Sequence, residues 1–201
     1  MPEAVERTPL AEDCAASSLA LLIIDMLSRW DFEDAEALLT QAVPIAPRIA
    51  ALKRRCKACR VPVIYANDNH GRWRSDFRDV VERALGAGGE GARIAERLRP
   101  EPDDYFVLKP KHSGFHATPL DLLLRHLKVR TVMLTGVSSD QCVLYTAADA
   151  RMNDYEVIVP RDAVATQTQE RNAQALRHFT QTLKIDTPLA HEVRMPAPPA
   201  N

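Results

Sequence analysis

Three residue types that cooperate in thiol chemistry follow three different apolar segments of this sequence. Asp25 comes directly after "LALLII", Lys109 ends "YFVLK", and Cys142 ends "GVSSDQC". A thiol attacks as its thiolate, which a neighbouring ammonium and a helix N-terminus stabilise. A nearby carboxylate can take the thiol proton and return it to a leaving group. Together they would supply a nucleophile that is already ionised when substrate arrives (Cys142), a cation (Lys109) and a general acid–base (Asp25). Taken singly, each residue would also suit an ordinary role in a turn, on the surface or in packing.

The apolar segments that would position these residues have the pattern of buried strands in a parallel sheet. Continuous β-branched runs alternate with longer amphipathic stretches, which predicts a three-layer α/β/α sandwich. Strands are predicted at 19–24, 61–66, 105–108, 131–136 and 155–160, with a short one near 183–186; helices are predicted at about 43–59, 118–127, 139–152 and 168–181, with shorter ones in 76–98.

Ligands of such sheets bind outside the carboxyl ends of the strands, where the acid, the lysine and the cysteine would meet. In a strand order of 3-2-1-4-5, Lys109 leaves a strand two positions from that of Asp25, roughly 10 Å away. The long lysine side chain must then span that gap. We expect Ser139 to cap the helix that carries Cys142, and Thr166 or Thr168 to cap the helix that follows.

Composition limits the classes of function. The 201 residues are 46% apolar and carry 26 basic against 27 acidic side chains. No basic run has interleaved aromatics, so nucleic acid is not an expected partner. No apolar run is long enough to cross a membrane, and the polar first residues do not resemble a signal peptide. We expect a cytoplasmic protein with a small-molecule substrate, free cysteines and one domain at 18–186, between a frayed leader (1–17) and a proline-rich tail (187–201).

Cys56 and Cys59 form a Cys-x-x-Cys pair at the end of a helical pattern. Redox dithiols of this spacing lie at the start of a helix that follows a strand. A structural zinc site would need a second such pair, which the sequence lacks. We therefore interpret both as ordinary helix-end cysteines.

The motifs around these residues resemble the isochorismatase-like cysteine hydrolases, which include nicotinamidases and N-carbamoylsarcosine amidohydrolase. The resemblance runs from about residue 18 to 165 and is carried mainly by "VLKPKHSGFHATPLDLLLRHL" and "TVMLTGVSSDQCVLYTAADARMNDYEVIVPRDA". It implies a six-stranded parallel, Rossmann-like sheet, a homo-oligomer and a catalytic triad of Asp25, Lys109 and Cys142. It further implies a cis peptide between Val137 and Ser138, which lets the N–H groups of Ser138 and Cys142 form an oxyanion hole.

The same resemblance implies cleavage of an amide-type C–N bond through a thioester on Cys142, without a cofactor. Some isochorismatases of this fold lack the cysteine and cleave a vinyl ether, so vinyl-ether hydrolysis with Asp25 as acid is one alternative. A non-catalytic domain of the same fold is another.

A metal site is not predicted. Nicotinamidases bind a divalent ion through an Asp-x-His pair after the second strand and a further histidine. Asp68 and His70 match the pair, but no histidine occurs between His70 and His112. We interpret His112 and His116 as loop or helix-start residues.

Substrate selectivity is expected from the loops after Asp25 and after the second strand. Trp30, Asn67 and Trp73 are predicted to contact the substrate, with Phe32 as a further candidate for the pocket wall. The aromatic residues would equally suit packing or subunit contacts. In the same loops, Arg29, Arg72 and Arg74 would bind a substrate carboxylate or remain solvated.

Overall fold

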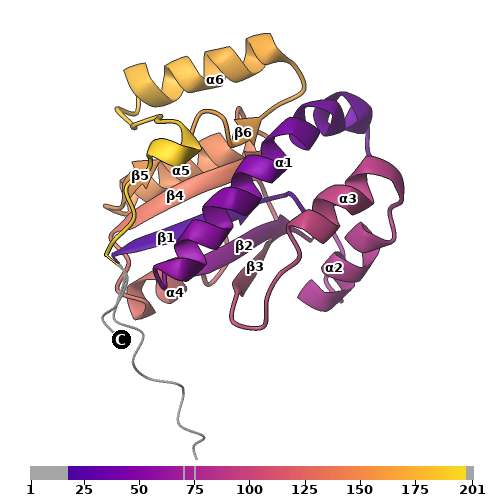
Figure 1. Ribbon diagram of the computed structural model, residues 1–201, viewed down its shortest axis with the longest axis horizontal. Coiled ribbons are helices and arrows are strands. Elements are labelled where there is room, and N and C mark those ends of the chain that lie inside the picture. The colour runs from indigo at the N-terminus through magenta and orange to yellow at the C-terminus, as the bar shows by residue number, and fades with distance from the viewer. Residues whose placement is uncertain (1–17, 70, 75, 198–201) are drawn as a thin grey trace, which may run out of the picture.

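A twisted parallel sheet of six strands forms the centre of the protein (Figure 1). The computed structural model describes residues 18–69, 71–74 and 76–197. The strands are β1 (Leu19–Ile24), β2 (Val63–Asp68), β3 (Tyr105–Lys109), β4 (Thr131–Val137), β5 (Glu156–Ile158) and β6 (Val164–Ala165). Their order is β3-β2-β1-β4-β5, with β6 paired to β4, so the predicted order 3-2-1-4-5 is confirmed. The sixth strand was predicted in the wrong place, because in 183–186 only Asp186 forms a bridge, to Ile158.

Helices cover both faces of the sheet, as predicted for a three-layer sandwich. They are α1 (Ala35–Ala58), α2 (Phe77–Leu85), α3 (Gly89–Arg97), α4 (Leu120–His126), α5 (Cys142–Met152) and α6 (Gln169–Gln181), with a 3₁₀ turn η1 (Ala190–Glu192). Helix α1 starts well before the predicted residue 43 and contains Pro44 and Pro47. Prolines disfavour helix interiors, but the buried face of α1, with Leu38 and Ile49, packs on the sheet and outweighs that cost.

The surroundings of the central strand, β1, explain why its apolar residues do not alternate with polar ones. Leu21 and Ile23 pack in the hydrophobic cluster that includes α1, while Leu22 and Ile24 pack in the cluster that includes α5. All four side chains are inaccessible to solvent. A strand buried on both faces needs apolar residues at every position, and it delivers Asp25 at its carboxyl end.

The chain remains packed beyond the predicted domain boundary at residue 186. The Arg55 guanidinium of α1 donates hydrogen bonds to the carbonyls of Ala190 and Val193, at 2.7 and 2.6 Å. Both of these residues are buried. The predicted leader, 1–17, lies outside the described residues. Within the described part of the chain, no helix combines the length and the apolarity that a membrane crossing requires.

Candidate active site

Asp25 lies at the carboxyl end of the central strand, in a left-handed backbone conformation with φ 52°. Its N–H donates to the Ala66 carbonyl, and its Oδ1 accepts the N–H of Asp68 at 2.8 Å. Both partners belong to the neighbouring strand β2. The carboxylate is therefore held in place by backbone groups on two sides.

Lys109 ends β3 and reaches across β2 to this carboxylate. Its Nζ lies 2.7 Å from Asp25 Oδ2 and 3.4 Å from Cys142 Sγ, and its side chain is fully buried. The same ammonium lies 3.8 Å from Asp68 Oδ2. The lysine side chain thus bridges the two-strand gap that the strand order imposes. The structure brings together all three of the predicted triad residues.

Cys142 is the first residue of α5, where the chain turns out of β4. Residues 138–141, the nucleophile turn, connect β4 to Cys142. Asp140 of this turn accepts a hydrogen bond from the Arg171 guanidinium at 2.7 Å and another from the Thr166 hydroxyl at 2.6 Å. Ser139 does not cap α5 as predicted, because its side chain is buried and its Oγ has no partner among the described residues.

Thr168, not Thr166, caps α6, accepting the N–H of Arg171 at 3.2 Å. Thr166 instead serves the nucleophile turn through its contact with Asp140. The sequence left open which of the two threonines caps this helix, and the structure shows that Thr168 does.

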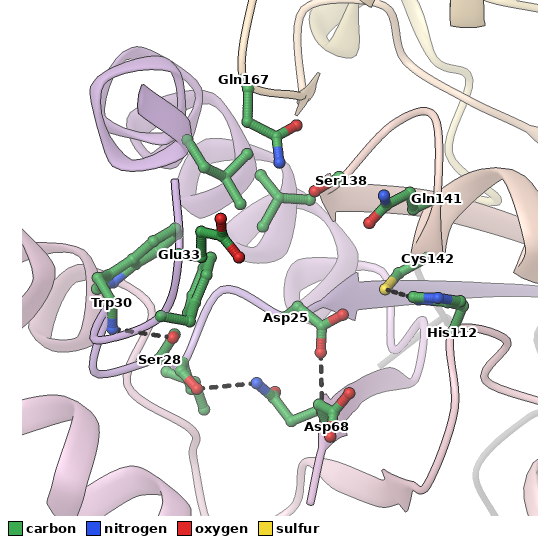
Figure 2. A pocket seen from close by; sticks show the side chains of 15 residues that line it. Asp25, Ser28, Trp30, Glu33, Asp68, His112, Ser138, Gln141, Cys142 and Gln167 are labelled. Atoms are coloured by element: carbon green, nitrogen blue, oxygen red, sulfur yellow. Dashed lines mark hydrogen bonds between the residues drawn. The ribbon is translucent and has the colours of Figure 1, made fainter. Parts of the chain in front are cut away.

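The peptide bond between Val137 and Ser138 is cis, as the family resemblance implied. Among the residues that the structure describes, neither the N–H of Ser138 nor that of Cys142 donates a backbone hydrogen bond. Both residues line the same cavity (Figure 2). Two residues that line the cavity thus have backbone N–H groups without a backbone acceptor in the described part of the chain.

The surroundings of Cys142 raise the pKa of its thiol. Burial, and then the Asp25 carboxylate, raise the pKa of Cys142 above its ordinary value, while Lys109 acts in the opposite direction without overcoming them. Burial alone would lower the pKa of Lys109, but the Asp25 carboxylate at 2.7 Å raises it, so the lysine is an ammonium. This direction runs against the expectation that the sulfur is already ionised, because desolvation disfavours the thiolate.

His112 is a member of the site that sequence reasoning missed. Its Nδ1 lies 3.7 Å from Cys142 Sγ, and its ring stacks on Tyr145 of α5 at 5.6 Å between centroids. It lies in the loop between β3 and α4, as interpreted, and it also lines the cavity (Figure 2). Its place three residues after Lys109 was the available signal, since the chain leaving β3 passes the same rim.

A cavity of about 350 Å³ opens above the cysteine, between the loop after β1 and the nucleophile turn. Trp30 and Asn67, two of the predicted substrate-binding residues, line it, as does Phe32. The Trp30 indole fills the space left by Gly91 of α3, where a Cβ would lie 2.5 Å from its Cδ1. The absence of a side chain at Gly91 thus determines where this wall of the cavity stands.

Trp73 does not line this cavity, contrary to the prediction. Its side chain is 79% exposed, on a shallow surface depression that also includes Arg72 and Arg74. Arg29 likewise lies in a neighbouring groove and pairs with Asp31 at 3.1 Å. These side chains follow loops without periodicity, so the sequence did not indicate which way they point.

The described residues do not complete a metal centre of the nicotinamidase kind. Asp68 lies toward the Lys109 ammonium, which opposes a second cation there, and His70 lies outside the described residues. Within the described part of the chain, no group of three or more His, Cys, Asp or Glu side chains could hold a metal ion. No step below passes through a metal.

Known proteins resemble the chain over most of its length. The family model described as "Isochorismatase domain" matches residues 19–187. The uncharacterized isochorismatase family protein YaaI of Bacillus subtilis is 37% identical over 157 residues, which is 78% of this chain and 86% of that protein.

Two solved structures extend this similarity to the fold. The nicotinamidase of Staphylococcus aureus is 27% identical, with a TM-score of 0.67 over 85% of this chain and 96% of its own. The N-carbamoylsarcosine amidase of Thermoplasma acidophilum is 28% identical, with a TM-score of 0.69 over 88% and 98%.

Proposed function

The chain belongs to the isochorismatase family, and from this premise we propose that it is a hydrolase of an amide-type C–N bond in a small molecule. The reaction passes through a thioester on Cys142. Support comes from the geometry of one buried contact: Lys109 Nζ lies 2.7 Å from the Asp25 carboxylate and 3.4 Å from the Cys142 sulfur. A nucleophile, a base and a cation within hydrogen-bonding reach are the elements of covalent acyl transfer.

Asp25 acts first as the base. As Sγ bonds to the substrate carbonyl carbon, the thiol proton passes to the Asp25 carboxylate. Lys109 remains an ammonium and stabilises the negative charge on the sulfur as it develops. A thiol that is neutral at rest fits this sequence, because ionisation then accompanies the attack.

The carbonyl oxygen becomes an oxyanion when the sulfur adds. We assign its stabilisation to the N–H groups of Ser138 and Cys142, which lack other acceptors in the described part of the chain. Preorganised backbone donors of this kind contribute on the order of 3–4 kcal/mol each to the transition state in other acyl-transfer enzymes.

The C–N bond then breaks and the amine or ammonia leaves with the proton that Asp25 held. Water attacks the thioester next and gives its proton to Asp25, which returns it to Sγ when the acid leaves. Each turnover consumes one amide and one water and releases one acid and one amine.

The proposal is tested with purified protein and a panel of small primary amides, imides and ureides. The expected result is release of ammonia or amine, together with an acyl adduct that intact-mass and peptide mapping place on Cys142. A panel that gives product without any adduct on Cys142, even after rapid acid quenching, would contradict the thioester route.

The protonation state of the thiol can be measured directly. Since burial raises the Cys142 pKa, the resting protein should contain no thiolate at this position near neutral pH. The ultraviolet thiolate absorbance of the wild type minus that of Cys142→Ser should therefore stay flat from about pH 6 to about pH 8.5. A step in this difference spectrum at or below neutral pH would show a pre-ionised sulfur instead.

A further inference from the structure

The cavity above Cys142 has an uneven charge distribution. Three carboxylates line it, those of Asp25, Asp68 and Glu33, and no lysine or arginine does so in the described part of the chain. Beneath the cavity, the buried Lys109 ammonium lies against two of these carboxylates, 2.7 Å from Asp25 and 3.8 Å from Asp68. Lys109 does not approach the third carboxylate, that of Glu33, so three acidic side chains face one ammonium and the cavity keeps a negative potential.

Glu33 contributes the charge that the proposed chemistry does not use. It lies on the loop between β1 and α1, and no described residue pairs with its carboxylate. Figure 2 shows that this carboxylate points into the cavity, between Trp30 and Ser138. A bound molecule could therefore contact it without displacing an existing ion pair.

A second acceptor in the same wall lacks a partner. Asn67 is 1% exposed, and its Nδ2 donates to the Leu27 carbonyl at 2.9 Å, which fixes the orientation of the amide. Its Oδ1 is buried without a hydrogen bond from any described residue. A buried acceptor without a donor costs free energy, so this oxygen favours a ligand that brings an N–H group.

The arginines nearby do not reverse this potential. Arg29, Arg72 and Arg83 line the adjacent groove and not the cavity; Arg29 pairs with Asp31 at 3.1 Å and Arg83 with Asp79 at 3.6 Å. A substrate carboxylate inside the cavity would face acidic side chains and no guanidinium of the described residues.

We infer that the cavity selects amides whose non-reacting end carries a positive charge, held by Glu33 and Asn67, and rejects amides that carry a carboxylate. This selectivity rests on the proposed function, because it places the reacting carbonyl at Cys142. Charged walls focus the field in a cleft and raise the local concentration of the oppositely charged ligand.

Two thiol reagents of similar size and opposite charge test the inference without knowledge of the substrate. The cationic 2-(trimethylammonium)ethyl and the anionic 2-sulfonatoethyl methanethiosulfonates both convert Cys142 to a mixed disulfide and release methanesulfinate. Rates are followed by mass spectrometry in a Cys14→Ser/Cys59→Ser background, and each is divided by the rate of that reagent with 2-mercaptoethanol.

At low ionic strength the normalised rate of the cationic reagent at Cys142 is expected to be at least about ten-fold that of the anionic reagent. Added salt should lower this cation-to-anion rate ratio. Glu33→Gln should lower the ratio about five-fold. The matched control is Glu36→Gln, an exposed position in the first turn of α1 outside the cavity, which should leave the ratio unchanged.

A ratio of one or less in the wild type would overturn the inference, and so would equal ratios in Glu33→Gln and Glu36→Gln. Failure of the proposed function has a different signature. There, amides of every charge would give neither product nor an acyl adduct on Cys142, whatever the reagent ratio is.

Discussion

Replacing Cys142 by alanine is expected to reduce amide turnover at least about 10³-fold, because no other group can form the acyl intermediate. Helix α5 should still fold, since the cysteine occupies its first turn and alanine is a good helix former. The measurement is the initial rate of amine release by the variant and the wild type on the best amide of the panel. Cys59→Ala is the control and should retain the wild-type rate, because Cys59 ends α1 and does not line the cavity.

Asp25→Asn, compared with Cys142→Ala, distinguishes the thioester route from vinyl-ether hydrolysis. A thioester route needs both residues, so both variants should lose turnover, the aspartate variant by about 10²-fold or more. In vinyl-ether hydrolysis Asp25 alone acts as the acid. Substantial activity of Cys142→Ala, combined with loss in Asp25→Asn, would therefore favour the vinyl-ether reaction. Full activity of both variants would indicate a site elsewhere.

Gly136→Ala is expected to cost at least about 4 kcal/mol of unfolding free energy or to prevent folding. Gly136 has φ +105°, and a Cβ there would lie 2.0 Å from the Ile24 carbonyl oxygen of the paired central strand. Neither backbone can move without separating β1 from β4, on which Asp25 and the nucleophile turn depend. The free energy of unfolding from urea titration gives the comparison.

Gly86→Ala provides the matched control. Gly86 ends α2 with φ −80°, a conformation that alanine adopts readily, and its nearest atom to a new Cβ is 3.3 Å away. Its unfolding free energy should change by no more than about 1 kcal/mol. A Gly136→Ala protein as stable as Gly86→Ala would show that the strand pair can separate locally.

Several features of this protein followed from the sequence alone. Strands whose apolar residues do not alternate with polar ones indicated a sheet covered on both faces. The carboxyl ends of those strands indicated the rim where Asp25, Lys109 and Cys142 lie. Strands buried on both faces have a strong local signature, which is why five of the strands were predicted near their positions. Roles at the site remain proposals, as do the homo-oligomer and the cytoplasmic location.

Other features could not be predicted because they depend on contacts between distant segments. Helix α1 contains Pro44 and Pro47, and only its packing on the sheet explains why it continues through them. The two-residue strand β6 depends on its pairing with β4, not on a pattern of its own. Trp73 and Trp30 have the same residue type in similar loops, yet one is exposed and the other packs where Gly91 leaves room.

The sequence by itself determined the kind of sheet and the three residues that follow its strands, because the apolar pattern of a buried strand is encoded locally. The pairing of the strands came from the structure. Only the tertiary structure decided what surrounds the sulfur: the contact of His112, the burial that raises the pKa of the thiol, and the Glu33 carboxylate that no described residue pairs with. These depend on side-chain direction and on desolvation. Both properties arise from packing among segments far apart in the chain, which no local pattern records.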